Sequence, residues 1–397
     1  MLQLAKETAI AGVVLLKNMN NLLPLSPALL AGRNIAVVGP CANNTFAQLG
    51  GYVNSHPLFV RTPFQGLTDS LPMSKVLLDA ACPDTDCPSF SQSAVTLASN
   101  ADYVVVVLGT NGFYKPGQNN ESAACGCPHG NAIEGECCDR MNTELPGVQL
   151  AFLQAIAALG RPLIVILVSG GSLDADWLLE SPAVGAIIHA PFLGMMAGAA
   201  LGDIITGVAS PSGRTTLTWY QNLTAALPPL GDYSGLYQST YRYVPASVPV
   251  TFPFGYGLSY AQFQYLGEPV FSPAVARACD IVNVTVVIAN TATVDGFEVV
   301  QVYGTILNAS VAPVPTRQLL AFSRVWIKEN SQVSVTLSIL PQTHAVYIGD
   351  AAVETVEPGP LDVWVGSSSD PSYPGAYGLL GRFSVTGPAV SVRECTK

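Results

Sequence analysis

Two short stretches, DYVVVVLG at Asp102–Gly109 and PLIVILVS at Pro162–Ser169, decide the fold of this chain. Both are rich in β-branched residues and neither alternates polar with apolar positions, which is typical of strands buried on both faces of a sheet. The stretches Asn34–Gly39, Lys75–Asp79 and Gly185–His189 share this pattern, and helix-length segments separate the five. Strands that alternate with helices predict a parallel, doubly wound α/β domain.

The pattern changes after residue 226. A segment rich in Pro, Gly and Tyr resists regular structure and is predicted to be a connector over residues 227–262. Beyond it, stretches such as Asn283–Ala289 and Gln332–Leu337 alternate apolar with polar residues and are separated by turn residues. This pattern predicts an all-β sandwich of immunoglobulin-like size over residues 263–397. The α/β domain is predicted over residues 1–226.

Charge is sparse in this chain of 397 residues, which carries 17 Lys and Arg against 27 Asp and Glu and a charged fraction of 11%. About 25% is usual. The hydrophobic fraction of 49% supports a large core and excludes disorder as the main state. A net charge of −10 argues against nucleic acid or an anionic membrane as a partner. No stretch offers the about 20 consecutive apolar residues of a membrane span.

Nine cysteines suggest an oxidising compartment, so the protein is predicted to be secreted. The N-terminal stretch MLQLAKETAIAGVVLL is not a signal peptide, because Lys6 and Glu7 interrupt its apolar part. It is predicted to be an amphipathic helix, and the chain is then expected to be a piece of a longer protein. Five N-x-[ST] sequons, which are candidate glycosylation sites, agree with secretion: Asn43, Asn120, Asn222, Asn283 and Asn308.

Several kinds of active site lack their sequence signature. No G-x-G-x-x-G follows the first strand and no P-loop is present, so no nucleotide cofactor is expected. No G-x-S-x-G motif is present either, which argues against a Ser/His/Asp hydrolase. The four histidines are scattered without H-x-x-x-H spacing. His189 ends a buried strand and is expected to be a hydrogen-bonded core residue.

The segment CGCPHGNAIEGECC at Cys125–Cys138 contains two cysteine pairs and His129, which are zinc-ligand types. Its C-x-C and adjacent cysteines differ from the usual C-x₂₋₄-C spacing of zinc sites. Disulfides that hold a long loop in an oxidising compartment are therefore the favoured interpretation, and zinc is the alternative.

The same loop carries the acids Glu121, Glu134, Glu136 and Asp139, followed by Arg140. A carboxyl group after a parallel strand lies at the edge of the sheet where ligands bind. Such a group can act as a general acid if burial or a neighbouring carboxylate raises its pKa. A solvated loop with a structural Asp139–Arg140 pair is the alternative, and residue types alone favour it.

Several stretches, in the order in which they occur, resemble glycoside hydrolase family 3, and especially its β-xylosidase branch. They include Glu7–Leu25 (ETAIAGVVLLKNMNNLLPL), Ile35–Leu67, Glu134–Gln149 (EGECCDRMNTELPGVQ), Phe252–Tyr260 (FPFGYGLSY) and Asn290–Val325. The resemblance covers nearly the whole chain. It implies the α/β sandwich domain of that family followed by a fibronectin type III-like domain. The stretch CPDTDC matches a cysteine pair of that branch, which implies a disulfide between Cys82 and Cys87.

The resemblance implies a retaining, exo-acting hydrolase of β-linked sugars such as xylo-oligosaccharides, without a metal or other cofactor. Such enzymes use a nucleophile and an acid/base, both of them carboxyl groups. In this family the acid/base is a Glu five residues before an Asp-Arg pair. Here that pair is Asp139–Arg140, so the matching residue is Glu134, with Glu136 as second choice.

In the family, the nucleophile is an Asp of an N-terminal (β/α)₈ barrel, and this chain begins where that barrel is expected to end. A catalytic barrel is therefore an expected partner upstream. Asp176 and Trp177 do not supply the nucleophile motif, because DADW aligns with a helix start where Asp174 is the expected N-cap. The alternative function is a non-catalytic carbohydrate-binding or interaction module without the barrel. The sugar, whether xylose, arabinose or glucose, stays open.

Overall fold

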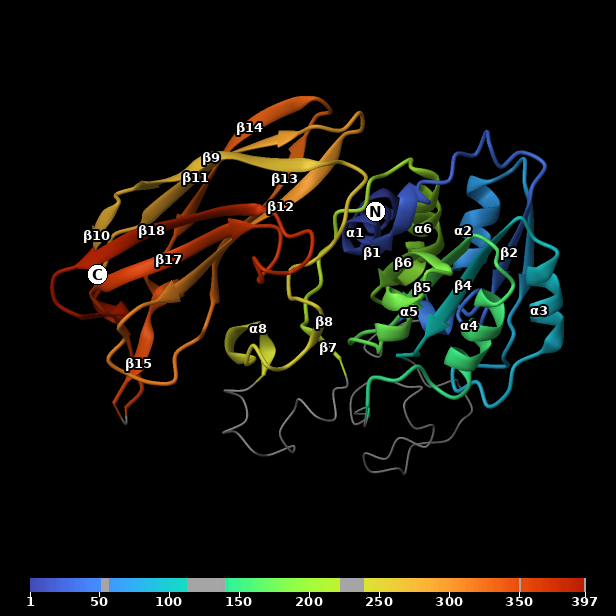
Figure 1. Cartoon of the computed structure of the whole chain (residues 1–397), viewed down its shortest axis with the longest axis horizontal. Coiled ribbons are helices and arrows are strands. Elements are labelled where there is room, and N and C mark those ends of the chain that lie inside the picture. The colour runs from blue at the N-terminus through green and yellow to red at the C-terminus, as the bar shows by residue number, and fades with distance from the viewer. Residues whose placement is uncertain are drawn as a thin grey trace. The chain divides into compact units, whose positions relative to one another are not determined.

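The computed structural model describes residues 1–50, 57–112, 134, 140, 142–221, 239–349 and 351–395. The chain divides into two compact units (Figure 1). The first unit comprises Met1–Gly213 and Gln221–Thr224, and the second comprises Arg214–Tyr220 and Ala225–Lys397.

The first unit is built on a six-stranded sheet with the strand order β1-β6-β5-β4-β2-β3. All neighbouring strands from β2 to β6 are parallel, while β1 is antiparallel to β6. In the helical layers, α1 and α2 pack against α6, and α3 packs against α4. The predicted parallel α/β domain is confirmed. The strands are β1 (Val14–Asn18), β2 (Asn34–Val38), β3 (Lys75–Asp79), β4 (Tyr103–Gly109), β5 (Leu163–Val168) and β6 (Val184–Ala190). The helices are α1 (Leu2–Gly12), α2 (Pro63–Ser70), α3 (Gln92–Ser99), α4 (Gln149–Ala157), α5 (Asp176–Glu180) and α6 (Ala197–Thr206).

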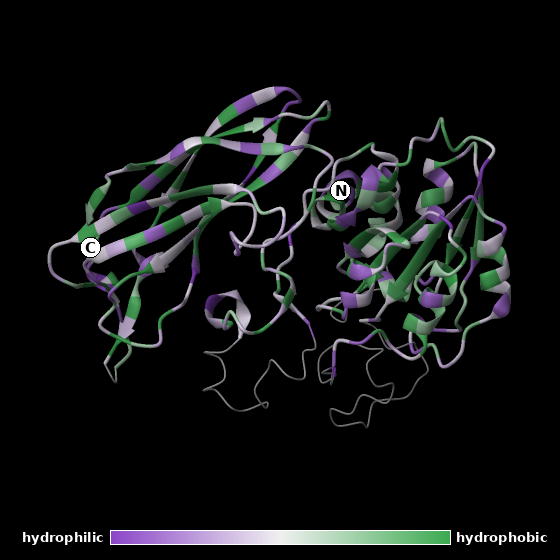
Figure 2. Ribbon diagram, in the orientation of Figure 1, coloured by the Kyte–Doolittle hydropathy of each residue, from purple (hydrophilic) through white to green (hydrophobic). Residues whose placement is uncertain are grey.

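Strands β4 and β5 form the centre of this core. Every residue of β5, and every residue of β4 after Tyr103, is buried. Figure 2 shows these parallel strands as hydrophobic along their length. Burial on both faces explains why neither strand alternates in sequence.

The N-terminal stretch is not a single helix, so that prediction is wrong after residue 12. Helix α1 ends at Gly12, and residues Val14–Asn18 form strand β1. Val14 pairs with His189 of β6, and Val13 to Leu16 are at most 2% exposed. Pairing covers the open edge of β6 and buries four apolar side chains, which outweighs the local helical pattern.

The predicted cap at Asp174 is also wrong, by one residue. The N-cap of α5 is Ala175, which has no capping side chain. The Asp174 carboxylate accepts a hydrogen bond of 3.0 Å from the backbone N–H of Asp176, the first residue of the helix. A side-chain cap bonds to the second or third helical N–H, so Asp174 lies too far back to be that cap.

Helices α2 and α6 cross at two glycines that bring their backbones into contact. A Cβ atom on Gly66 would lie 1.8 Å from the carbonyl oxygen of Gly198. A Cβ atom on Gly198 would lie 1.9 Å from the carbonyl oxygen of Thr62. Neither neighbour is a flexible side chain, so a larger residue at either position has to push the helices apart.

We therefore expect Gly198→Ala to lower the free energy of unfolding by about 1–3 kcal/mol, the usual range for overpacking, despite the higher helix propensity of Ala. Urea unfolding of the full chain measures this change. Gly12→Ala in α1 is the matched control, because its Cβ would meet only Leu193 Cδ2 at an ordinary 3.4 Å. Equal stability of the two variants would contradict the proposed backbone contact.

The second unit is a β-sandwich, as predicted. Its five-stranded sheet has the order β10-β18-β17-β12-β13, and its three-stranded sheet has the order β14-β11-β9. The shared core contains fully buried side chains from both sheets, such as Val284, Ile288, Val302 and Val363. The strands are β9 (Phe263–Ser272), β10 (Val275–Arg277), β11 (Val282–Asn290), β12 (Gly296–Ile306), β13 (Gln318–Ile327), β14 (Ser331–Ile339), β17 (Gly359–Gly366) and β18 (Gly378–Thr386).

Smaller elements complete the second unit. The pair β7–β8 and the sheet β15-β16-β19 lie outside the two main sheets. The second unit also contains two short helices, α8 (Thr240–Tyr243) and α9 (Val392–Cys395). The short strands are β7 (Trp219–Tyr220), β8 (Val250–Phe252), β15 (Val346–Ile348), β16 (Val353–Val356) and β19 (Val390–Ser391).

Two disulfides are described. Cys82 is bonded to Cys87, which confirms the pairing implied by the resemblance. Cys279 is bonded to Cys395 across a sequence separation of 116, a pairing that the sequence left open. Cys41 is buried as a free thiol.

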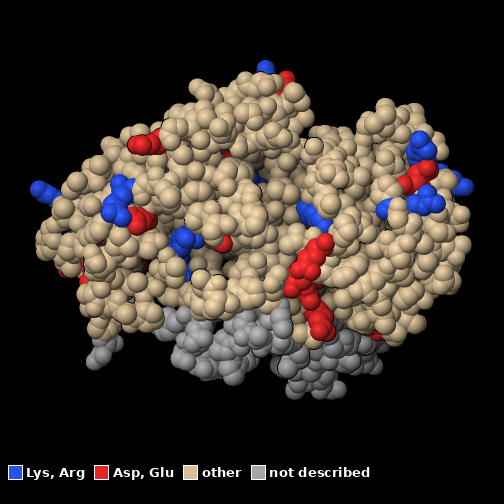
Figure 3. Space-filling model, viewed as in Figure 1, with Lys and Arg blue, Asp and Glu red and all other residues tan. Residues whose placement is uncertain are grey.

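The molecular surface reflects the low charge of the sequence. On the face in Figure 3, Lys, Arg, Asp and Glu cover a small part of a largely uncharged surface, in separate groups of which the longest is a red stripe of acidic residues. Among the described residues, no helix has both the length and the apolar character needed to cross a membrane.

Candidate functional site

Two loops meet at the carboxyl edge of the parallel sheet in the first unit. One follows β4, with Thr110 and Asn111, and the other follows β5 with Ser169 and Gly170. The backbone N–H of Thr110 donates to the carbonyl oxygen of Val168 at 2.8 Å, which ties the loop after β4 to the last residue of β5. Ligands of doubly wound folds bind at this edge of the sheet.

Glu134 is held at this edge through both its backbone and its side chain. Its backbone N–H donates to the carbonyl oxygen of Asn111 at 2.9 Å. Carboxylate Oε2 accepts hydrogen bonds from the backbone N–H groups of Gly170 and, at 3.2 Å, Gly171. Oε1 lies 2.6 Å from Nε of Arg140. The Glu134 carboxylate is therefore fixed by two backbone N–H donors and by its ion pair with Arg140.

Arg140 links this carboxylate to the loop after β5. Its Nη2 donates to the carbonyl oxygen of Ser172 at 2.6 Å. The side chains of Arg140 and Glu134 are only 10% and 12% exposed. Burial lowers the pKa of the Arg140 guanidinium, and the Glu134 carboxylate opposes that shift. The two residues form a largely desolvated ion pair, which is costly to break.

The two consecutive glycines are required by the crowding of this site. A Cβ atom on Gly170 would lie 2.8 Å from Phe192 Cε2 and 3.1 Å from Glu134 Oε2. A Cβ atom on Gly171 would lie 3.1 Å from Arg140 Nη2. Glycine lets the backbone N–H groups approach the carboxylate closely.

Below these glycines, Ser169 and His189 hold the loop. Ser169 Oγ donates to the carbonyl oxygen of Gly171 at 2.7 Å. Nε2 of His189 lies 3.2 Å from both Oγ and the carbonyl oxygen of Ser169. Burial lowers the pKa of His189 from 6.5 to about 4, so the ring is neutral at pH 7. His189 is thus the buried, hydrogen-bonded core residue that the sequence predicted.

His189 should make stability depend on pH. In the unfolded chain the ring takes up a proton near pH 6.5, while the folded protein resists protonation down to about pH 4. The stability from the neutral ring is complete above pH 6.5 and is lost as the pH falls toward 4. We expect a slope of about 1.4 kcal/mol per pH unit from this residue in that window. Urea unfolding between pH 4 and 7 would show a shallower slope for His189→Gln, and unchanged slopes would contradict the assignment.

Other predicted residues fall in different places. Several of them lie outside the described residues: Glu121, Glu136, Asp139, Asn120, Asn222 and the Cys125–Cys138 segment with His129. Within that segment Glu134 alone is described. Asn43 and Asn308 are exposed, and Asn283 is half-buried with its side-chain oxygen accepting from Ser338 at 2.8 Å. Within the described part of the chain, no group of three or more His, Cys, Asp or Glu could hold a metal ion.

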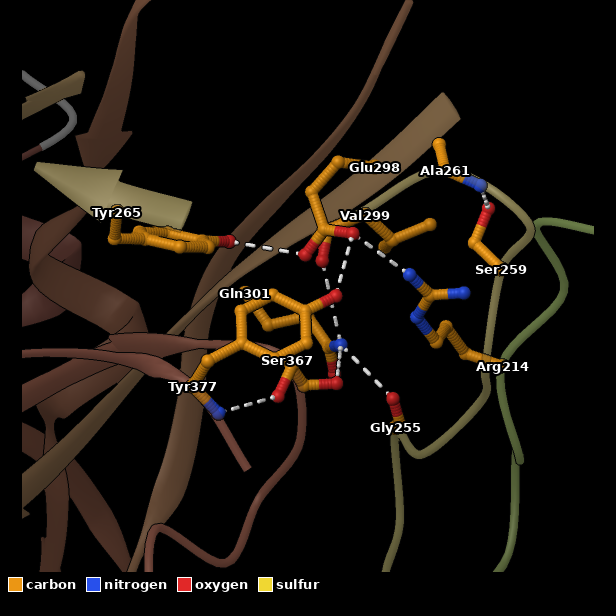
Figure 4. Close-up of polar contacts among 10 residues, drawn as sticks. All are labelled: Arg214, Gly255, Ser259, Ala261, Tyr265, Glu298, Val299, Gln301, Ser367 and Tyr377. Carbon is orange, nitrogen blue, oxygen red and sulfur yellow. Dashed lines mark hydrogen bonds and ion pairs between the residues drawn. The ribbon is translucent and has the colours of Figure 1, made fainter. Parts of the chain in front are cut away.

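Sequence reasoning missed a buried polar cluster in the second unit (Figure 4). Glu298 of β12 is 0% exposed and forms a 2.8 Å ion pair with Arg214. The hydroxyl groups of Tyr265 and Tyr377 also donate to this carboxylate, at 3.2 and 3.1 Å. Burial raises the pKa of Glu298, and the nearby Arg214 guanidinium opposes the shift. One signal could have revealed the cluster, because Glu298 occupies an inward-facing position in an alternating strand.

Residues 13–260 match the glycosyl hydrolase family 3 C-terminal domain. The chain belongs to glycoside hydrolase family 3. Residues 298–369 match the fibronectin type III-like domain that the resemblance implied. The α/β unit of this family 3 chain thus carries Glu134, and the β-sandwich follows it.

Curated relatives of this family 3 chain include enzymes named as β-xylosidases. A β-xylosidase of Formosa agariphila is 30% identical over 381 residues, which cover 92% of this chain and 48% of the relative. Beta-D-xylosidase 1 of Arabidopsis thaliana is 34% identical over 273 residues, which cover 66% of this chain and 31% of the relative. The chain therefore spans about half or less of the length of these relatives.

Solved structures agree on the fold. A family 3 β-glucosidase of Bifidobacterium adolescentis is 27% identical with a TM-score of 0.76, over 96% of this chain and 53% of its own. A family 3 exo-β-xylosidase in complex with a xylobiose aziridine probe has a TM-score of 0.79 at 24% identity, over 98% of this chain and 49% of its own. At that identity the second likeness concerns the fold alone.

Proposed function

We propose that this chain is the acid/base-bearing part of a secreted, β-xylosidase-like retaining glycosidase, with Glu134 as the acid/base. The observation that carries the proposal is the position of Glu134. Its carboxylate is held by Arg140 and by the N–H groups of Gly170 and Gly171, at the edge of the sheet where α/β domains bind ligands. It is also the residue that matches the family acid/base in sequence.

In the first step of a retaining mechanism, the acid protonates the leaving glycosidic oxygen while a second carboxylate attacks the anomeric carbon. In the second step the same residue removes a proton from water, and the water oxygen displaces the enzyme carboxylate from the sugar. The arrangement at Glu134 fits the second step, because two backbone N–H donors and the Arg140 guanidinium complement a carboxylate, which is the form that removes the proton from water.

In the first step Glu134 acts as the acid, so one of its two carboxyl oxygens has to carry the proton that is donated. Both lone pairs of Oε2 face N–H donors, from Gly170 and Gly171. Oε1 lies 2.6 Å from Nε of Arg140 in an ion pair and accepts no hydrogen bond from the described residues, so it is the oxygen that can hold a proton. Oε1 is shielded from solvent. We propose that the Oε1 side of the carboxyl group turns toward the glycosidic oxygen when substrate binds.

The retaining mechanism also needs a second carboxylate, the nucleophile. We propose that it belongs to an upstream catalytic barrel and that the substrate is a β-linked xylo-oligosaccharide. A chain that supplies the acid/base but no nucleophile cannot form the glycosyl-enzyme. We therefore expect no hydrolysis of 4-nitrophenyl β-D-xyloside by the 397-residue chain alone.

The proposal is tested by joining the chain to the barrel of the Formosa agariphila β-xylosidase. We expect the fusion to hydrolyse the xyloside and to release β-xylose first, observed by proton NMR before mutarotation. Release of α-xylose first would contradict the retaining mechanism. Turnover by the chain alone, abolished by Glu134→Gln, would contradict the need for a barrel.

A further inference from the structure

A cavity of about 410 Å³ lies within the second unit. One wall comes from the segment around α8, including Tyr241, Pro245 and Pro249. The opposite wall comes from two loops of the sandwich, before β13 and after β17, with Arg317 and Asp370. A volume of roughly 300–1,000 Å³ is usual for small-molecule sites.

The first wall is apolar and rigid. Tyr241 stacks on Phe254 with ring centroids 4.4 Å apart and an interplanar angle of 20°. The ring of Tyr303 packs edge-on against the ring of Tyr241, with the two centroids 5.8 Å apart. Proline rings at 245 and 249 extend this surface. Such a surface suits the C–H face of a ring-shaped ligand and costs little conformational entropy on binding.

The second wall carries one positive and one negative group. Arg317 donates through Nη1 to the carbonyl oxygen of Ser369, which uses one of its five N–H groups. Asp370 accepts from the backbone N–H and Oγ of Ser372 at 2.9 and 2.7 Å, and both bonds use Oδ1. Among the described residues, Oδ2 has no hydrogen-bond partner. Both charged residues therefore retain hydrogen-bonding capacity.

Arg317 and Asp370 are close enough to interact electrostatically. Within the described ranges, however, they form no direct ion pair of 4.0 Å or less. A group that both accepts and donates a hydrogen bond could bridge them, and a hydroxyl group does this. A charged ligand would instead meet one residue of its own sign.

We propose that this cavity is a binding site for a neutral sugar of one or two rings, with its hydroxyl groups on Arg317 and Asp370 and its apolar face on Tyr241. This site lies wholly in the second unit and uses no part of the Glu134 site, so it goes beyond the proposed function. Only the choice of xylose-based probes rests on that function.

The test is a titration of the full chain with methyl β-D-xyloside and with xylobiose. Binding is measured by isothermal titration calorimetry and by saturation-transfer NMR. We expect saturable binding that Arg317→Ala and Asp370→Asn each weaken at least tenfold. Arg382→Ala and Asp362→Asn are matched controls, because this pair lies exposed on the same sandwich with a 2.5 Å contact. We expect both controls to bind as the native chain does.

Glu134→Gln separates this inference from the proposed function, because it should leave binding to the cavity unchanged. Arg317→Lys is a variant that is expected to keep the fold, since a lysine can still donate to the carbonyl oxygen of Ser369. Near-ultraviolet circular dichroism checks that each variant is folded. Absence of saturable binding of either probe would overturn the inference. It would also be overturned if folded Arg317 and Asp370 variants bound as tightly as the native chain, or if Glu134→Gln alone abolished binding.

Discussion

Glu134→Gln, in the chain joined to a family 3 barrel, is expected to lower kcat/KM for xylobiose by about 10²–10⁴-fold, the usual contribution of a general acid or base. The amide keeps the shape of the side chain but cannot donate an acidic proton to the leaving oxygen. With 4-nitrophenyl β-D-xyloside the loss of kcat/KM should be smaller, because nitrophenolate leaves without protonation. Steady-state kinetics with the two substrates measures this difference.

Glu144→Gln is the matched control, since Glu144 is an exposed glutamate in the same region whose only bonds to described residues are local ones to Asn142. We expect it to retain native kinetics. Azide should restore turnover of the nitrophenyl substrate by Glu134→Ala, because this anion attacks the glycosyl-enzyme without a base. Equal losses for both substrates, together with no glycosyl azide, would rule Glu134 out as the acid/base.

Glu298→Gln is expected to lower the free energy of unfolding of the second unit by about 3–5 kcal/mol, because it leaves the buried Arg214 guanidinium without a countercharge. The Arg214 side chain is 7% exposed and that of Glu298 is 0% exposed, so water cannot replace the lost partner. Chemical unfolding monitored by tryptophan fluorescence measures the effect.

Asp362→Asn provides the comparison, because the side chains of Arg382 and Asp362 are 59% and 45% exposed. Exposed pairs contribute about 0–1 kcal/mol, so this variant should be nearly neutral. Replacing Arg214 and Glu298 together by Met should recover part of the stability lost in Glu298→Gln. A loss below about 1 kcal/mol for Glu298→Gln would mean that the cluster tolerates an unpaired charge.

Much of the fold could be predicted from local pattern. Lys75–Asp79 is a strand with the bounds expected, and the strand expected at Pro162–Ser169 extends over Leu163–Val168. Strands buried on both faces consist of consecutive apolar residues, and such a run is visible in the sequence without knowledge of the partner strand. The alternation of β11 and β14 is equally local.

Apart from the cap at Asp174, what the sequence missed lies where distant residues decide the local structure. Val14–Asn18 could form a helix on its own, and it is a strand because β6, which begins only at Val184, offers an unpaired edge. The ion pair of Arg214 and Glu298 and the disulfide of Cys279 and Cys395 likewise join residues far apart in sequence. No short motif marks such pairs.

The candidate site at Glu134 could likewise be predicted only in part. The residues after β4 and β5 could be expected to meet, because parallel neighbouring strands end at one edge. The pairing of Glu134 with Arg140 could not be predicted, because it depends on how the Gly170–Gly171 loop presents its N–H groups. Glu134 in the acid/base role stays a prediction until kinetics test it.

The bond between Cys279 and Cys395 turns the intervening part of the sandwich into a covalent ring. Closing so long a loop is expected to stabilise the unit by about 4–5 kcal/mol through the lost entropy of its unfolded chain. The ring also changes how the unit bears mechanical load. Tension applied beyond Cys395 passes directly to Cys279, so the strands from β11 to β19 are bypassed and a single protease cut between them releases no fragment.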